Sequence, residues 1–230
     1  MFRIKICGIT NVEDALAAVY AGDDAGADAI GLNFYPKSSR YIDVPTTTTI
    51  LNEIPPSLYR VGVVVNEEAA ELNRLIATLD GTSTNPLHAI QLHGDEPPAY
   101  LATVRIKTII RARRFTDRGV AAIAADLEAC EKWRRFPDAV LIDAAAPGQY
   151  GGTGTTVSWR GLADYRRSLH NVPLILAGGL TPDNVAEAIR IVRPAAVDVA
   201  SGVESSPGKK DHAKLRDFIA AAREAFASNS

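Results

Sequence analysis

Short apolar segments alternate with amphipathic segments along the whole chain. Stretches with the helical spacing of apolar positions separate them, such as "NVEDALAAVYAG", "NEEAAELNRLIATL" and "PDNVAEAIRIV". Continuous apolar runs alternating with helices are typical of parallel strands that helices cover. The pattern therefore predicts eight strand–helix units, with strands at 2–7, 28–34, 59–65, 88–93, 105–112, 139–143, 172–177 and 196–200.

Eight units in 230 residues average about 29 residues each, which is close to one βαβ period. That count favours a closed (β/α)8 TIM barrel of the α/β class over an open doubly wound sheet. The weakest expected helix is the second, "VPTTTTILNEI", because four consecutive threonines have poor helix propensity. The stretch "DGTSTNPL" at 80–87 reads as a small surface insertion. No linker divides the chain, so we expect residues 1–230 to form one domain.

Composition adds little that points to a charged partner. Hydrophobic residues make up 47% of the chain, and the formal net charge is -2, which gives no general attraction to nucleic acid or anionic membranes. No apolar run approaches the ~18–20 residues that span a bilayer. The early charges at Arg3 and Lys5 do not suit a signal peptide, so we expect a cytoplasmic protein with reduced cysteines. Cys130 should pack as a small apolar residue, and the arginines at 111, 113 and 114 should be solvated.

Reactive side chains of such barrels lie at the carboxyl ends of the strands, where this chain has Cys7 and Asp143. Cys7 is open to three interpretations: a buried filler, a metal ligand or a catalytic thiol. A metal is the weakest of these, since no other cysteine or histidine stands at ligand spacing. Asp143 fits a desolvated acid, but a helix cap or an ion-pair partner explains it equally well. Strand alternation should point Arg3, Lys5 and Cys7 to the same side.

Three glycine-bearing loops follow the last three strands: "YGGTGTT", "LAGGLTPDN" and "VASGVESSPGKK". The loops after strands seven and eight are the usual phosphate site of this barrel, because backbone N–H groups there can bind an anion. A plain turn explains each loop singly. The pair, with exposed N–H groups expected at Gly179 and Gly202, favours a phosphate site.

Several motifs stand in a specific order along nearly the whole chain: "KICGIT", "GLNFYPKSSRYI", "VGVVVNE", "IQLHGDE", "LIDAAAPGQYGGTG", "LAGGLTPDNV" and "VDVASGVESSPGKKD". In these the chain resembles the phosphoribosylanthranilate isomerase family of tryptophan biosynthesis. The resemblance implies a barrel that performs an Amadori rearrangement without metal or cofactor. The aminoaldose N-(5-phosphoribosyl)anthranilate becomes the aminoketose 1-(2-carboxyphenylamino)-1-deoxyribulose 5-phosphate. It implies a small phosphorylated substrate, and a monomer or homodimer.

The resemblance also implies roles for individual residues. Cys7 would be the general base, Asp143 the general acid, and Arg40 of "KSSRYI" the partner of the anthranilate carboxylate. The site should then lower the pKa of Cys7, raise that of Asp143, or do both, with Lys5 stabilising the thiolate. The other expected substrate contacts are Asp198, the phosphate-binding Gly178, Gly179, Ser201 and Gly202, and a covering loop with Gly152 and Gly154.

Three departures from the family pattern concern Thr155 and Arg111, where lysine is frequent, and "VSW" at 157–159, where "FDW" is frequent. They put the covering loop in question. Three rival functions are open: an isomerase that also accepts the histidine-pathway aminoaldose, a non-catalytic phosphate-binding barrel, and a thiol redox protein. The first usually employs two aspartates, and the second would lack Cys7 or Asp143. The third lacks a C-x-x-C motif.

Overall fold

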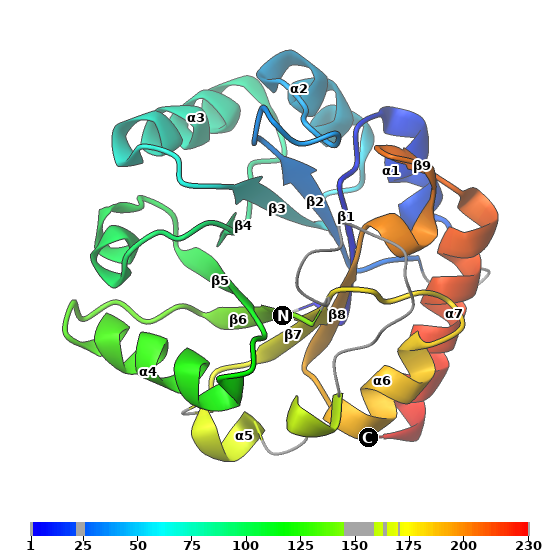
Figure 1. Cartoon of the computed structure of the whole chain (residues 1–230). Helices are drawn as coiled ribbons and strands as arrows, with labels where there is room; N and C mark the ends of the chain where they lie inside the picture. Colours follow the sequence, from blue (N-terminus) through cyan, green and yellow to red (C-terminus); the bar gives the residue numbers. More distant parts are fainter. Residues whose placement is uncertain (1, 22–25, 145–158, 163–164, 170, 230) are drawn as a thin grey trace.

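The protein folds as a closed barrel of eight parallel strands in chain order, so the predicted (β/α)8 fold is confirmed (Figure 1). This computed structural model describes residues 2–21, 26–144, 159–162, 165–169 and 171–229. The barrel strands are β1 (Ile4–Cys7), β2 (Ala29–Asn33), β3 (Tyr59–Val64), β4 (Ala89–Leu92), β5 (Thr108–Arg114), β6 (Ala139–Asp143), β7 (Leu174–Ala177) and β8 (Ala196–Val199).

Helices surround the barrel: α1 (Val12–Val19), α2 (Val44–Glu53), α3 (Ala69–Thr82), α4 (Gly119–Glu131), α5 (Tyr165–Ser168), α6 (Val185–Val192) and α7 (His212–Ser228). The 3-10 helix η1 (Pro98–Thr103) takes the place of an α-helix between β4 and β5, and η2 (Trp159–Leu162) precedes α5. A third, η3 (Ser201–Val203), follows β8. An additional antiparallel hairpin of β9 (Glu204–Ser206) and β10 (Lys209–Lys210) comes before α7. Within the described ranges no helix has the length and apolar character to cross a membrane.

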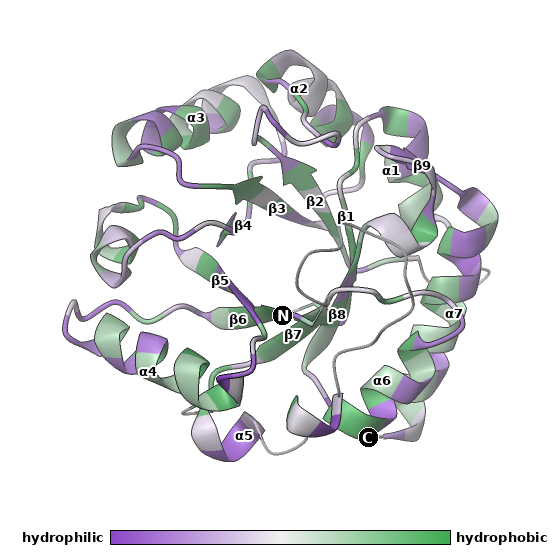
Figure 2. Ribbon diagram, in the orientation of Figure 1, coloured by the Kyte–Doolittle hydropathy of each residue, from purple (hydrophilic) through white to green (hydrophobic). Residues whose placement is uncertain are grey.

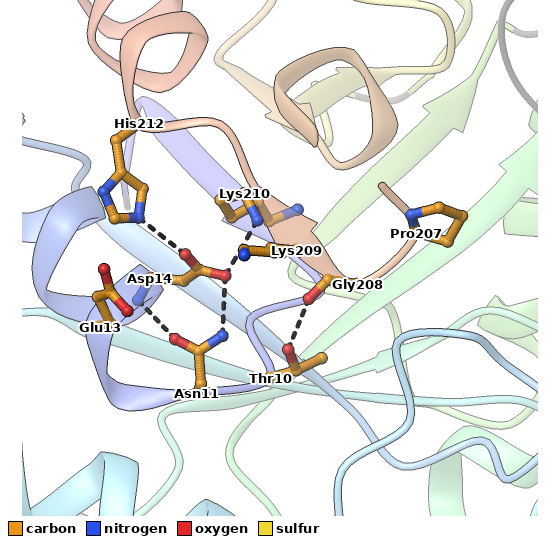
Figure 3. Close-up of a pocket in the computed structure, with 9 residues that line it drawn as sticks. All are labelled: Thr10, Asn11, Glu13, Asp14, Pro207, Gly208, Lys209, Lys210 and His212. Carbon is orange, nitrogen blue, oxygen red and sulfur yellow. Dashed lines mark hydrogen bonds and ion pairs between the residues drawn. The ribbon is translucent and has the colours of Figure 1, made fainter. Parts of the chain in front are cut away.

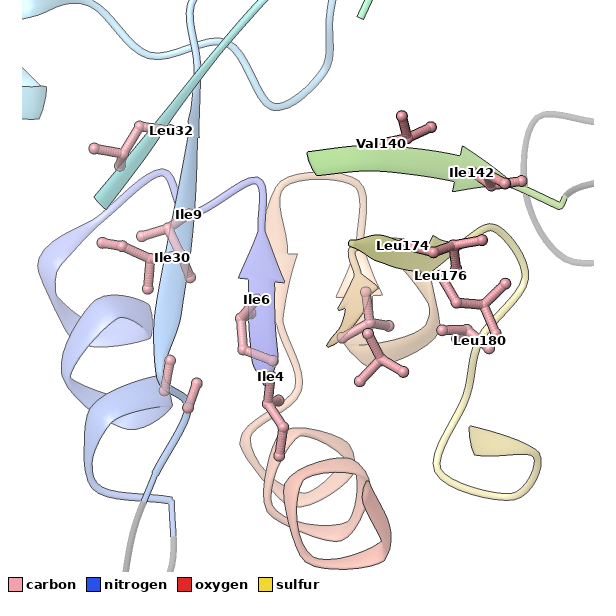
Figure 4. Close-up of a cluster of buried hydrophobic side chains, with 14 of the residues drawn as sticks. Ile4, Ile6, Ile9, Ile30, Leu32, Val140, Ile142, Leu174, Leu176 and Leu180 are labelled. Carbon is pink, nitrogen blue, oxygen red and sulfur yellow. The ribbon is translucent and has the colours of Figure 1, made fainter. Parts of the chain in front are cut away.

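Strand alternation divides the core into two apolar layers. One face of the strands packs against the helices, as Figure 4 shows for Ile4, Ile6, Ile30 and Leu32. The other face fills the barrel interior, mainly with small residues such as Ala29, Ala89, Ala112, Ala139 and Ala196. The strand ribbons are accordingly mostly green in Figure 2, whereas purple is concentrated on loops and outer helix surfaces. Both strand faces are buried, which is why the strands read as continuous apolar runs in the sequence.

The second helix forms despite its threonines because its first turn is capped. Asp43 accepts a hydrogen bond from the Thr46 N–H at 2.9 Å, and Pro45 lies in the first turn. The Thr47 hydroxyl donates back to the Asp43 carbonyl at 2.7 Å. The opposite face buries Ile50 completely. A cap and a buried apolar face outweigh the poor intrinsic propensity of four β-branched residues.

Residues 80–87 lie mostly at the surface, as expected: α3 extends to Thr82, and the buried Asn85 donates to the Leu51 carbonyl at 2.9 Å. The expectation that Arg111 is solvated is wrong. Arg111 is fully buried, since strand alternation turns it outward from β5 against α4, where Asp126 binds it. Arg114 is exposed as expected, and Cys130 is fully buried, which confirms its apolar role.

Candidate active site

A charged network fills the carboxyl end of the barrel interior. The fully buried Lys5 of β1 reaches Asp198 of β8 with its Nζ at 2.9 Å and Gln91 of β4 at 3.1 Å. Lys5 and Cys7 face the same side, as the alternation predicts. Arg3 does not, because β1 begins only at Ile4 and the Arg3 guanidinium lies over the ring of Phe226 at 5.4 Å.

Cys7 is the last residue of β1 and is partly exposed. Its neighbour across the strand pair is Gly31 of β2. A Cβ at Gly31 would lie 2.7 Å from the Cys7 Sγ and 3.1 Å from the Lys5 Cε, so the missing side chain makes the space that both groups occupy. The thiol and the ammonium are thereby packed together.

The charges around Cys7 act in opposite directions. Burial raises the pKa of the Cys7 thiol, and the charge of Asp198 raises it further. Lys5 and Lys210 lower this pKa but do not overcome burial. A lowered pKa for Cys7 is thus not found, although Lys5 contributes in the expected direction. Burial also disfavours the charged form of Lys5, but the charges of Asp198 and Cys7 raise its pKa overall, so Lys5 keeps its proton.

Gln91 of β4 and His93, which follows this strand, are two polar residues to which the sequence assigned no role. Because an ammonium can only donate, Lys5 fixes the Gln91 amide with its oxygen toward Nζ and its nitrogen toward His93 Nδ1, 2.7 Å away. Desolvation by the surrounding protein lowers the pKa of His93, although its side chain is in contact with solvent. A neutral His93 that accepts at Nδ1 carries its hydrogen on Nε2. The network therefore sets the tautomer of a histidine at the barrel end where Asp143 closes β6.

Arg40, in the loop between β2 and α2, is held by Glu204 of the hairpin. Its Nε and Nη2 each lie 2.7 Å from a Glu204 carboxylate oxygen. The Arg40 side chain crosses Gly8, where a Cβ would collide with its Cδ and where φ is +73°. Only glycine adopts this backbone conformation without strain and leaves this space. Arg40 therefore passes directly beside the residue that follows Cys7.

The glycine loops after β7 and β8 are in contact. Gly178 and Gly179 have φ values of 85° and 66°, and the Asn184 side chain donates to the Gly179 carbonyl at 2.9 Å. A Cβ on Gly202 would collide with the Leu180 carbonyl oxygen, so the loop after β8 packs against the loop after β7. Ser201 begins η3 at this point. Two adjacent glycines with positive φ, open space beside Gly179 and a helical turn can form an anion-binding backbone.

The structure thus brings together Cys7, Arg40, Asp143, Asp198 and the glycines of two loops at strand carboxyl ends. Gly152 and Gly154 lie outside the described residues. Within the described ranges, no group of His, Cys, Asp or Glu side chains could hold a metal ion. Sequence reasoning missed Glu204 and Lys210, although both stand in the quoted "VESSPGKK". In this segment a glutamate and a lysine stand on opposite sides of a Pro-Gly turn, and this was the sequence signal for an ion pair across a hairpin.

Comparisons with known proteins match nearly the whole chain to one family. The family model described as N-(5'phosphoribosyl)anthranilate (PRA) isomerase matches residues 4–221. The enzyme of that name from Acidithiobacillus ferrooxidans is 47% identical over 223 residues, 97% of this chain and 98% of the relative.

Solved structures give the same result. The crystal structure of phosphoribosyl anthranilate isomerase from Thermotoga maritima has 42% identity and a TM-score of 0.80, covering 97% of this chain and 100% of that one. A phosphoribosyl anthranilate isomerase in complex with reduced 1-(o-carboxyphenylamino)-1-deoxyribulose 5-phosphate has 41% identity and a TM-score of 0.76, with the same coverage. The chain belongs to the N-(5'-phosphoribosyl)anthranilate isomerase family.

Proposed function

We propose that the carboxyl end of this barrel performs the phosphoribosylanthranilate isomerase reaction of tryptophan biosynthesis, with Cys7 as general base and Asp143 as general acid. The product is 1-(2-carboxyphenylamino)-1-deoxyribulose 5-phosphate. One observation carries the assignment: a thiol and a carboxylate end β1 and β6 of the same closed barrel. The reaction needs an acid and a base at one sugar, and these two residue types can supply them.

The chemistry divides into two proton transfers. Asp143 gives a proton to the ribose ring oxygen, the bond from C1 to this oxygen breaks, and the anthranilate nitrogen supplies the electrons that form an iminium ion. Cys7, as thiolate, then removes the proton from C2. The resulting enolamine tautomerises to the ketone. Because burial raises the pKa of Cys7, the thiolate depends on the charge of Lys5 beside it.

The ends of the substrate match two parts of the site. The planar guanidinium of Arg40 suits the anthranilate carboxylate. The backbone at Gly178, Gly179, Ser201 and Gly202 suits the phosphate. Asp198 contributes a further polar contact while Lys5 holds it. The compound in the similar solved complex carries both a carboxyphenyl group and a 5-phosphate, which supports this division.

Gly152 and Gly154 would belong to a loop that covers the substrate. We further propose one isomerase domain over residues 1–230, without metal or cofactor, in the cytoplasm, and without nucleic acid or membrane partners. It would be a monomer or a homodimer. A similar solved structure concerns monomers generated from a dimeric Thermotoga maritima enzyme, with 39% identity and a TM-score of 0.75.

The test is turnover of N-(5-phosphoribosyl)anthranilate by the purified protein, with aminoketose formation measured with and without EDTA. Equal rates with EDTA are expected. Asp143→Asn should lose turnover while still binding substrate, because an amide cannot give the ring oxygen a proton. Normal turnover of Asp143→Asn alongside an inactive Asp198→Asn would reverse the two carboxylates.

A further inference from the structure

The hairpin of β9 and β10 is additional to the eight strand–helix units and lies against the loop that follows Cys7. The Thr10 hydroxyl donates to the Gly208 carbonyl at 2.6 Å. On the outside of the barrel, the Lys210 N–H and the His212 Nε2 bind Asp14 at 3.0 and 2.9 Å, beside an open cavity of about 590 Å³ (Figure 3). These hydrogen bonds anchor the hairpin to the start of α1.

On its inner side the hairpin holds Lys210, whose side chain is completely buried. Its Nζ lies 2.7 Å from the Cys7 carbonyl, 3.1 Å from the Ala200 carbonyl and 3.0 Å from Glu204 Oε1. An ammonium has three hydrogens, and these three acceptors use all of them. Lys210 therefore connects the backbone of the proposed base, the end of β8 and the hairpin.

Glu204 continues this network to Arg40. Its side chain is 5% exposed, and it binds Arg40 through Nε and Nη2. This pair occupies one edge of the guanidinium. The other edge, formed by Nη1 and the second Nη2 hydrogen, does not contact Glu204. This edge can donate two parallel hydrogen bonds to a second carboxylate. Glu204 carries one negative charge, and its two partners, Arg40 and Lys210, carry one positive charge each. The cluster therefore has a net charge of +1, which the carboxylate of the anthranilate group would neutralise.

We propose that Glu204 is a positioning residue that orients Arg40 for the carboxylate of the substrate, with Lys210 fixing Glu204 and the Cys7 backbone in one unit. This inference rests on the proposed function. Its consequence is geometric: the distance between the base and the carboxylate site is set by the hairpin. A substrate without the carboxylate does not depend on Glu204.

The kinetic test compares Glu204→Gln with the wild type on two substrates, N-(5-phosphoribosyl)anthranilate and the carboxylate-free N-(5-phosphoribosyl)aniline. Glutamine keeps the shape but cannot accept both Arg40 bonds. KM for the anthranilate substrate should rise about tenfold or more, with a smaller change in kcat and an unchanged KM for the aniline substrate. Glu71→Gln, which removes an exposed glutamate paired with Arg74 at 2.6 Å, is the matched control and should leave both substrates unaffected.

A double variant separates positioning from general damage. In an Arg40→Ala background, Glu204→Gln should add nothing to KM, because its effect passes through Arg40. An additive rise, or an equal rise for both substrates, would overturn the inference while wild-type turnover still supports the proposed function. NMR of the wild type covers the case of a poorly folding variant. The Arg40 Nε–H signal, assigned by its loss in Arg40→Ala, should exchange slowly with water, and rapid exchange would also overturn the inference.

Discussion

Lys5 and Arg111 are both fully buried cations on barrel strands, and each is paired with an aspartate. Lys5 points into the barrel, where its Nζ meets Asp198 and lies beside Cys7. Arg111 points outward from β5 and binds Asp126 of α4 at 2.6 Å. In a barrel strand, side-chain parity decides whether a buried charge acts on the reacting groups or holds a helix against the barrel.

The two pairs also differ in how fully they are satisfied. Lys5 has acceptors from two strands, Gln91 and Asp198. Arg111 shares Asp126 with Arg113, and its Nη1 has no hydrogen-bond partner among the described residues. An unmatched buried donor reduces what the Arg111 pair contributes to stability, compared with a pair whose hydrogen bonds are all made. Lys5 and Arg111 should therefore respond differently to the same substitution.

The largest effect belongs to the thiol that Lys5 faces. Cys7→Ser should lower kcat by ~10²–10⁴, because an alcohol does not supply a base near neutral pH. The melting temperature should stay close to that of the wild type, since the substitution is small and Cys7 is partly exposed. Steady-state kinetics and thermal melting measure the two quantities. Retention of more than half the wild-type kcat would remove Cys7 from the mechanism.

Lys5→Met should come next. Lys5 lowers the pKa of Cys7, so its removal raises that pKa. The limb of the kcat/KM profile that reports the thiol should move to higher pH while the other limb stays in place, and kcat/KM at pH 7 should fall by about tenfold. Circular dichroism checks the fold. An unmoved limb in a folded variant would reject Lys5 as the charge that tunes Cys7.

Arg111→Met, the same change on the other face of the sheet, should alter stability alone. Asp126 keeps Arg113, whose Nε lies 3.0 Å from its carboxylate, so the substitution does not strand a buried charge. We expect a loss of about 1–3 kcal/mol in the free energy of unfolding, measured by urea denaturation. The kcat/KM profile should match the wild type. A shifted thiol limb in this variant would contradict the division between inner and outer cations.

The same distinction explains how far the sequence predicts the molecule. The alternation of apolar runs and helices predicts the barrel because both layers of its core follow strand parity. The strand ends identify Cys7 and Asp143 by position. Arg111 was assigned to the surface because charge normally indicates exposure, and nothing in the local pattern shows that Asp126 lies behind it.

The hairpin was missed for a related reason. β9 and β10 contain three and two residues, too few for a periodic signal. The contacts of Glu204 and Lys210 join positions more than 160 residues apart in the sequence, as with Arg40 and Cys7. Such contacts depend on closure of the barrel. A single sequence shows which residue types are present but not which of them come into contact in the folded barrel.

The smallest predicted effect concerns another buried cation, Arg60, at the amino end of β3. Its guanidinium donates to the carbonyls of Pro86 and Leu58 at 2.8 and 2.9 Å and lies 3.1 Å from the His88 Nε2. The Arg60 N–H also points at the His88 Nδ1. A neutral imidazole accepts at one nitrogen, and a protonated ring accepts at neither. Protonation of His88 therefore removes a contact and places two positive charges together.

Burial and the charge of Arg60 lower the pKa of His88 from its ordinary value of 6.5. The stability that the neutral ring contributes is thus complete above pH 6.5 and is lost as the pH falls through the lowered pKa. His88→Gln removes this titration. Between pH 7.5 and 5, the melting temperature of the variant should therefore fall less than that of the wild type, and the two falls should differ by less than about 3 °C. Parallel curves of melting temperature against pH for the variant and the wild type would show that His88 does not contribute to the pH dependence of stability. An unchanged kcat/KM in the variant is expected, because His88 lies at the opposite end of the barrel from Cys7.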